Sequence, residues 1–183
     1  EAMPKPLASG ERTAPVCQNG ATRTLPMHQS PANARAPIKN QKPWKTQKRV
    51  REVMDKLYSS APDGLCGDED NGQTSAWYVF SAMGFYPVAP GTGQYAIGSP
   101  LFKNVKLHLQ NGNIFEMNVP NNSKENVYIH KISKNKSTHT KNYITFKDLM
   151  DGASFSLEMS NQPNTKLRTR KESRPYSMSQ ENK

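Results

Sequence analysis

The stretch GDEDNGQTSAWYVFSAMGFYP, residues 67–87, decides how this chain folds. It begins with three adjacent carboxylates between two glycines and continues into a run that is apolar on nearly every side. We expect a helix from Thr74 to Met83, closed by Gly84 at the C′ position. A helix that is apolar nearly all round is typical of a buried helix.

A second helix is expected upstream of this stretch. Pro43 suits the first turn of a helix, and Ser59 to Pro62 would end it after roughly 15 residues. Apolar side chains recur there at helical spacing, at Val50, Val53, Met54, Leu57 and Tyr58, with charged residues opposite. Two helices cannot close a helical core alone, so we interpret them as the last pair of a larger helical domain.

Downstream of Pro90 the apolar period changes to two. Asn111–Gly112 is a hairpin signal between two alternating runs, and Val127 to Ile132 predicts a third strand. Thr145 and Asp148 have the spacing of a capping box, closed by Gly152. Phe155, Leu157 and Met159 predict a last strand. These patterns predict a small antiparallel β unit over residues 91–160.

The two ends of the chain are expected to lack structure of their own. Residues 1–42 are rich in proline and show no apolar periodicity, which predicts disorder. Residues 161–183 are read as an unstructured basic tail. The organisation expected is thus 1–42 disordered, 43–90 helical with the acidic loop, 91–160 β unit, and 161–183 tail.

The formal charge of +10 comes mainly from the ends, since residues 57–100 contain no Lys or Arg. No stripe of basic and aromatic residues supports a nucleic-acid interface, so solvated charge is the better interpretation. No segment approaches the roughly 18 apolar residues of a membrane span. A signal-peptide pattern is absent from the first residues, and we expect any signal to precede them. For Cys17 and Cys66, a disulfide and two free thiols are both open.

The acidic loop is the candidate catalytic site. In an extended loop Asp68 and Asp70 would point to one side, while Glu69 points away. Mutual repulsion and partial desolvation would suit this pair to proton transfer. The alternative is that the carboxylates only cap the following helix. A calcium EF-hand is excluded, because its twelfth position would be Val79.

Several blocks in order resemble glycoside hydrolase family ninety-two, a family of calcium-dependent exo-α-mannosidases. The chain is similar to it from Trp44 onward, over about 140 residues. The blocks are PWKTQKRVRE (43–52), GDEDNGQTSAWYVFSAMGFYP (67–87), YAIGSPLF (95–102), NNSKENVYI (121–129), KNYITFKDLMDG (141–152) and RPYSMS (174–179).

The resemblance implies an α+β fragment that holds the last helices of an (α/α)6-type barrel and the β unit. It implies inverting hydrolysis of α-mannosidic linkages, α-1,2 among them, with Asp70 as the base and Asp68 as its neighbour. It also implies calcium, whose ligands it does not place here, and a mannose-containing glycan as partner. Trp44 and Gln73 are taken as substrate-binding, although ordinary packing is the competing interpretation for Trp44.

The departures from the family pattern are informative. The family's general acid lies in a Glu-Gly-Asn-aromatic block upstream, which these 183 residues do not contain. Leu25 stands where a family glutamate of the leaving-sugar subsite would be. We therefore expect a truncated enzyme that is inactive alone and whose complete parent is secreted or periplasmic. A catalytically inert carbohydrate-binding remnant, with sugar held by the β unit, is the alternative, and a polyanion-binding protein is a third.

Overall fold

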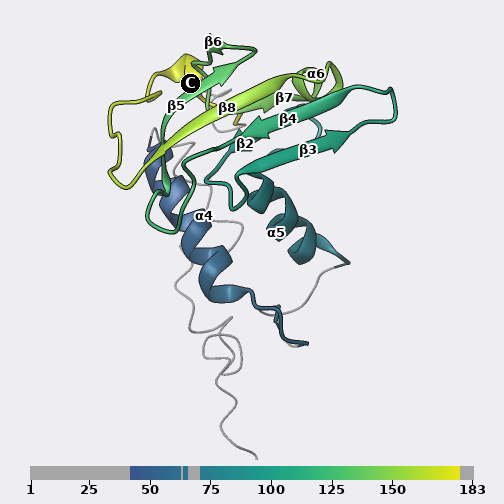
Figure 1. Cartoon of the computed structure of the whole chain (residues 1–183), viewed down its shortest axis with the longest axis vertical. Helices are drawn as coiled ribbons and strands as arrows, with labels where there is room; N and C mark the ends of the chain where they lie inside the picture. Colours follow the sequence, from purple (N-terminus) through teal and green to yellow (C-terminus); the bar gives the residue numbers. More distant parts are fainter. Residues whose placement is uncertain (1–41, 63, 66–70, 178–183) are drawn as a thin grey trace, which may run out of the picture.

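The computed structural model describes residues 42–62, 64–65 and 71–177. They form a mixed α+β arrangement in which two helices lie along one side of two β-sheets (Figure 1). The helices are α4 (Pro43–Leu57), α5 (Gln73–Met83) and the short α6 (Phe146–Met150). The expected α+β class is therefore confirmed, while the assignment of α4 and α5 to a barrel stays a prediction.

Helix α4 begins and ends as the sequence predicts. It spans 15 residues with Pro43 in its first turn, and its buried face includes Val50, Val53, Met54 and Leu57. Helix α5 begins one residue earlier than expected, at Gln73, and ends at Gly84, whose φ of 106° is left-handed. That backbone conformation favours glycine, as expected for a C′ residue.

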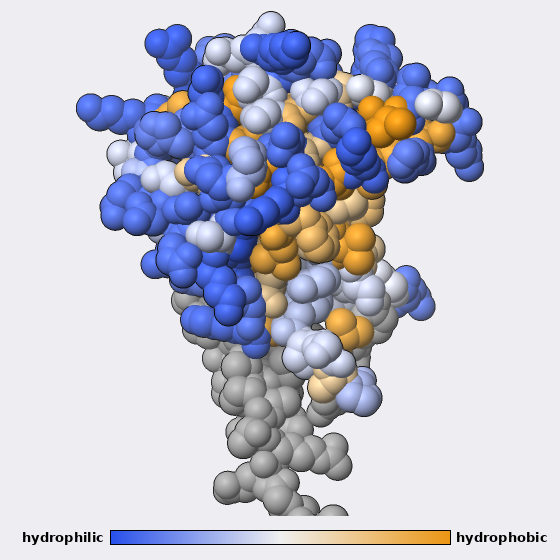
Figure 2. All heavy atoms as spheres, viewed as in Figure 1, coloured by the Kyte–Doolittle hydropathy of each residue, from blue (hydrophilic) through white to orange (hydrophobic). Residues whose placement is uncertain are grey.

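The expectation that α5 is buried all round is wrong for the described residues. Only Trp77, Ser81 and Ala82 of this helix are buried, and the side chain of Val79 is 53% exposed. Within that part of the chain, α5 packs against α4 on one side and against β1 at its end. Phe80 and Met83 are partly buried against the core of the two sheets, whereas Val79 stays exposed, and Figure 2 shows apolar residues gathered over this region.

Within the described ranges, eight strands form two sheets. The three-stranded sheet has the order β1-β2-β7, with β1 Phe85–Tyr86, β2 Gln94–Ile97 and β7 Tyr143–Thr145. The five-stranded sheet has the order β3-β4-β8-β5-β6. Its strands are β3 Asn104–His108, β4 Ile114–Asn118, β5 Tyr128–Lys134, β6 Ser137–Thr138 and β8 Ser154–Ser160. The expected β3–β4 hairpin is confirmed, with Asn111 and Gly112 in its turn.

The prediction of a purely antiparallel β unit is wrong in one pairing. Strand β8 lies between β4 and β5, antiparallel to β5 but parallel to β4. The chain returns through β7 and α6 before it enters β8, so β8 reaches β4 in the same direction. Alternation of apolar residues predicts which face of a strand is buried, but it does not determine which strands pair with it or in which direction.

Helix α4 is joined to strand β5 and to the loops before β3 and after β4 by polar contacts, most of them buried. The Gln47 Oε1 atom accepts the Ile129 N–H at 3.0 Å. The Arg51 guanidinium donates to Pro100 O, to Asn122 Oδ1 and, at 3.3 Å, to Ser123 O. These bonds hold α4, and with it the start of the acidic loop, in a defined position on the β unit.

The expectation of an unstructured tail is wrong for residues 161–177. The segment contains a 3-10 turn at Lys171–Ser173, and Ser173 and Ser177 are buried. Asn142 donates its backbone N–H to Ser173 O and its side-chain amide to Arg168 O, both at 2.7 Å. The polar composition of the tail did not indicate that it packs, because Asn142 binds backbone oxygens of the tail and these are the same for any residue type. The disorder expected before Lys42 lies outside the described residues, as do both cysteines.

Candidate functional site

The candidate site is the loop that joins α4 to α5. Asp68, Glu69 and Asp70 lie outside the described residues, so the predicted roles of Asp68 and Asp70 stay predictions. The structure does describe the two ends of the loop, at Leu65 and at Asn71, and the first end is held by specific contacts.

A tight turn forms the first end of the loop. Tyr58 and Leu65 form an isolated antiparallel bridge. Ser59 N–H donates to Gly64 O, and Gly64 N–H donates to Ala61 O, each at 2.9 Å. A Cβ atom on Gly64 would lie 2.1 Å from Ser59 O, so only glycine fits this turn. These contacts fix the backbone at Leu65, the last described residue before the acidic segment.

The second end of the loop passes through two left-handed residues. Asn71 has φ 57° and Gly72, the N-cap of α5, has φ 87°. Such angles favour glycine and asparagine, which explains why this dipeptide precedes the helix. Because Gly72 holds the N-cap position, neither Asp68 nor Asp70 occupies the position from which a side chain ordinarily caps a helix.

Tyr58 links the start of the loop to the first turns of α5. Its hydroxyl donates to Thr74 O at 3.2 Å. Its ring stacks on Trp77 with centroids 5.8 Å apart and an interplanar angle of 13°, and lies 4.7 Å from the ring of Tyr78. Sequence analysis missed this role of Tyr58. A tyrosine at the end of a helix before a loop was the available signal, but it is not specific.

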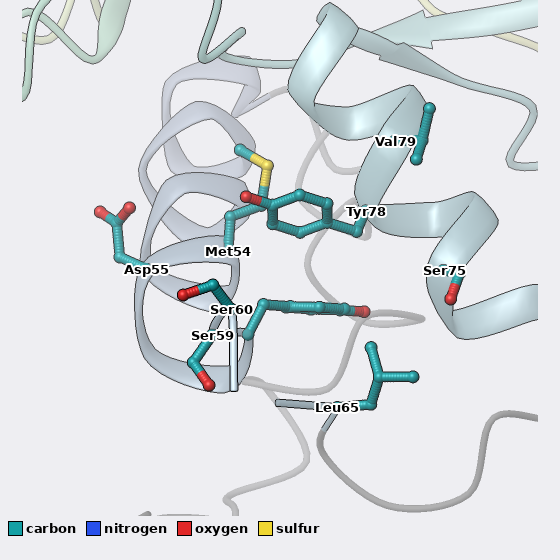
Figure 3. Close-up of a pocket in the computed structure, with 9 residues that line it drawn as sticks. Met54, Asp55, Ser59, Ser60, Leu65, Ser75, Tyr78 and Val79 are labelled. Atoms are coloured by element: carbon teal, nitrogen blue, oxygen red, sulfur yellow. The ribbon is translucent and has the colours of Figure 1, made fainter. Parts of the chain in front are cut away.

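A pocket lies beside these contacts, between the C-terminal end of α4 and the N-terminal half of α5 (Figure 3). Its volume is about 610 Å³. Apolar and hydroxylated side chains of both helices and of the loop's first end line it: Met54, Asp55, Tyr58, Ser59, Ser60, Leu65, Ser75, Tyr78 and Val79.

The other two predicted site residues lie at opposite ends of the helix pair. Gln73 is exposed at the first residue of α5, directly after Gly72. Trp44 lies in the first turn of α4, partly buried, with Lys45 Nζ 5.3 Å from its ring centroid. At 1.5 Å per residue, Trp44 is roughly 20 Å from the helix end that leads into the loop. The structure thus brings Gln73, but not Trp44, near the loop's ends.

No calcium site is formed by the residues that the structure describes. Within those ranges, no group of three or more His, Cys, Asp or Glu side chains lies close enough to hold a metal ion. Asp55 is the one carboxylate among the described residues that line the pocket, so those residues do not fit the cation that the resemblance implies. Likewise, none of the helices in this part of the chain has the length and apolar character of a membrane span.

Comparison with known proteins gives one consistent result. A family model described as the glycosyl hydrolase family 92 catalytic domain matches residues 39–161. An "uncharacterized secreted glycosidase" of the fungus Arthroderma benhamiae is 30% identical over 121 residues, which cover 64% of this chain and 16% of that protein.

Two solved structures from Bacteroides thetaiotaomicron match more of the chain. A family 92 α-mannosidase in complex with mannoimidazole has a TM-score of 0.76 and 38% identity, covering 81% of this chain and 20% of its own. A family 92 inverting mannosidase from strain VPI-5482 has a TM-score of 0.71 and 54% identity, covering 75% and 19%. The present chain therefore spans about a fifth of the length of these solved relatives.

Proposed function

The chain belongs to glycosyl hydrolase family 92, and from that premise we propose that it supplies the C-terminal, base-bearing part of an inverting α-mannosidase. The observation that supports the proposal is the way the described ends of the acidic loop are arranged. The Gly64 turn fixes the first end, the second end passes through the left-handed Asn71–Gly72 step, and Tyr58 joins the start of the loop to Thr74 in the first turn of α5. A loop anchored in this way can hold a carboxylate in position for catalysis.

In the proposed reaction Asp70 is the general base. Its carboxylate accepts a proton from a water molecule, whose oxygen attacks the anomeric carbon as the glycosidic C–O bond breaks. A carboxylic acid on the opposite face gives its proton to the departing oxygen, so protons balance and the configuration inverts. Asp68 orients the water or shares the proton. The relative that is 54% identical and named an inverting mannosidase supports this assignment.

The general acid must come from outside these 183 residues. From the resemblance, it lies in a Glu-Gly-Asn-aromatic block that this sequence lacks. The missing upstream part of the same enzyme is therefore the partner that completes the site. Calcium, when bound, would contact sugar hydroxyls; no step here is assigned to it, because the described residues do not form its ligand set.

The proposed substrate is a mannose-containing glycan with α-1,2 linkages, and Gln73 is the better placed of the two predicted substrate contacts. Trp44 would have to contact a more distant part of a glycan, or simply pack against neighbouring residues. A secreted or periplasmic location of the complete enzyme is proposed in line with the secreted fungal relative.

The proposal is tested in a complete family 92 enzyme that carries residues 43–177 of this chain. Asp70→Asn should lower kcat by about 10²–10⁴-fold, because the amide keeps the side-chain shape but cannot accept the proton. Asp68→Asn should also reduce turnover severely. Binding of a non-hydrolysed mannoside should largely survive in both variants.

Glu69→Gln is the matched control, since it removes a carboxylate from the same loop that the alternation of an extended chain predicts to point away from Asp68 and Asp70. It should leave kcat close to that of the unmodified enzyme. If Asp70→Asn instead lowers the melting temperature and leaves the turnover of folded enzyme unchanged, the loop serves only as a cap of α5, and the proposed function of this segment is wrong.

A further inference from the structure

The sequence contains the pattern Asn-x-Ser/Thr twice, as NNS at residues 121–123 and as NKS at residues 135–137. With any residue but proline in the middle, this tripeptide is the acceptor for N-linked glycosylation in secreted proteins. Because such a tripeptide also arises by chance, the structural surroundings of each asparagine decide which of the two fits that role.

The second tripeptide lies at the tip of the β5–β6 hairpin. Asn135 and Lys136 stand between Lys134 and Ser137, which pair with each other across the two strands. Both tip residues have left-handed φ angles, 48° and 68°, as a two-residue turn of type I′ requires. Asn135, Lys136 and Ser137 are all exposed. The whole tripeptide therefore projects into solvent.

The amide nitrogen of Asn135 is accessible for a covalent bond. The Oδ1 atom of this side chain accepts the Ser154 N–H at 2.9 Å, which orients the amide group. Within the described part of the chain, neither the Nδ2 atom of Asn135 nor the hydroxyl of Ser137 makes a hydrogen bond. A sugar on this nitrogen would thus replace no contact among the described residues.

The side chain of Asn121 is used by the fold instead. Its Nδ2 atom donates to Met159 O at 2.7 Å, and its Oδ1 atom accepts the Met159 N–H at 3.0 Å, so the amide pairs with β8 as a neighbouring strand would. A sugar on this nitrogen would replace one of its two hydrogens and lie against β8. The next residue, Asn122, accepts a bond from the buried Arg51.

The two tripeptides also differ in their distance from the candidate site. Figure 1 shows β6 at the end of the molecule opposite the segment that follows α4 and leads into the acidic loop. A glycan attached at the tip before β6 would extend away from that loop. Residues 121–123, in contrast, belong to the contacts that hold α4 on the β unit.

We propose that Asn135 is an N-glycosylation site and that Asn121 is not. The donor is an oligosaccharide linked through pyrophosphate to a lipid of the eukaryotic secretory pathway. A bond forms between Asn135 Nδ2 and the anomeric carbon, the bond from that carbon to the pyrophosphate oxygen breaks, and the nitrogen releases one proton. This inference rests on the proposed secretion of the complete enzyme, for which the secreted fungal relative is the support, and it requires no turnover.

The test is secretion of the 183-residue chain from yeast behind a cleavable leader. The unmodified chain should carry one glycan that peptide N-glycosidase F removes. That enzyme converts the glycosylated asparagine to aspartate, and a peptide map should place the aspartate at residue 135. Ser137→Ala keeps the turn residues but removes the hydroxyl that the acceptor pattern requires, so the glycan should be lost. Ser137→Thr keeps the pattern and should retain the glycan.

Ser123→Ala is the matched control, because it removes the same hydroxyl from the other tripeptide. It should leave the glycan at Asn135 unchanged, and circular dichroism should show all variants folded. Any chain retained in the cells is mapped in the same way. The proposal is overturned if the unmodified chain carries no removable glycan, if the map places a glycan at Asn121, or if Ser137→Ala keeps the glycan.

This experiment can fail separately from the proposed function. A glycan at Asn135 together with normal turnover in Asp70→Asn would retain the modification site and reject the catalytic assignment. Loss of turnover in Asp70→Asn with an unmodified Asn135 would give the opposite result.

Discussion

Arg51 shows how a single residue joins the helices to the β unit. Its guanidinium is buried and its hydrogen bonds go to two backbone carbonyls and the Asn122 amide oxygen. Burial lowers the pKa of Arg51, and the nearby carboxylate of Asp55 raises it in part. Asn122 also donates to Pro100 O at 3.1 Å and to Phe102 O at 3.3 Å, so it joins the two loops that surround this charge.

Asn122→Ala is expected to destabilise the chain by about 2–3 kcal/mol. The substitution removes three hydrogen bonds and leaves part of a buried guanidinium without an acceptor. Urea unfolding followed by circular dichroism measures the change. Asn126→Ala is the control, because the Asn126 amide makes an exposed bond to Asn121 O, and it should change the free energy of unfolding by less than about 0.5 kcal/mol.

At the scale of an element, α6 shows how a helix of five residues is stabilised. Thr145 Oγ1 accepts the Asp148 N–H at 3.1 Å, and Asp148 Oδ2 accepts the Thr145 N–H at 2.8 Å, which is the capping box that the sequence predicts. Lys134 of β5 forms an ion pair with the same carboxylate. Burial, the largest influence, would raise the pKa of Asp148, but the bonds from Lys134 and Thr145 together lower it.

A pH-dependent loss of stability follows for Asp148→Asn. A carboxyl whose folded pKa is lowered contributes its stability above the ordinary value of about 3.9, and loses it as the pH falls through the folded value. The variant should therefore be less stable by about 1–2 kcal/mol at pH 7, and the difference should shrink below about pH 4. Thermal unfolding of both chains at pH 7 and pH 3 measures this. An equal difference at the two pH values would contradict the assigned role.

At the scale of the whole molecule, the tail belongs to the folded body. Asn142 binds it at Arg168 and Ser173, and Tyr176 N–H donates to Gln94 Oε1 at 2.7 Å. The tail is thus held at two places along the three-stranded sheet: by Asn142, directly before β7, and by Gln94 in β2.

Limited trypsin digestion should accordingly leave a core that keeps residues 161–177, with Lys166, Arg168, Arg170 and Lys171 uncut. Asn142→Ala should expose the tail and speed cleavage after Arg168 and Arg170, while Asn126→Ala should not, because opening must precede cleavage at a packed site. Mass spectrometry of the products identifies the cuts. A stable product that ends at Lys166 in the unmodified chain would show that the tail is not part of the core.

The 183-residue chain alone should release no mannose from α-mannosides, with or without added calcium. An inverting site without its acid loses protonation of the leaving group, an effect of about 10²–10⁴-fold, and this chain spans about a fifth of its solved relatives. Measurement of free mannose after long incubation tests this. Calcium-dependent release from purified chain would mean that the site is complete without further residues.

Local patterns in the sequence were enough to predict much of the fold. Helical spacing predicted α4 and α5, alternation predicted the β3–β4 hairpin, β5 and β8, and the spacing of Thr145 and Asp148 predicted the cap of α6. Each of these features depends on neighbours a few residues away, so the sequence contains the whole signal. The carboxylate pair likewise identified the acidic loop as the candidate site, and the roles of Asp68 and Asp70 stay predictions.

The tertiary structure alone decided the features that depend on partners distant in sequence. Strand β8 pairs in parallel with β4, Val79 is exposed on an apolar helix, and the tail packs through Asn142. The contacts of Tyr58 also depend on residues distant in sequence. Thr74, Trp77 and Tyr78 lie next to it only because α4 and α5 pack together. Periodicity determines which face of an element is apolar, but the element that covers it is selected by packing of the whole molecule.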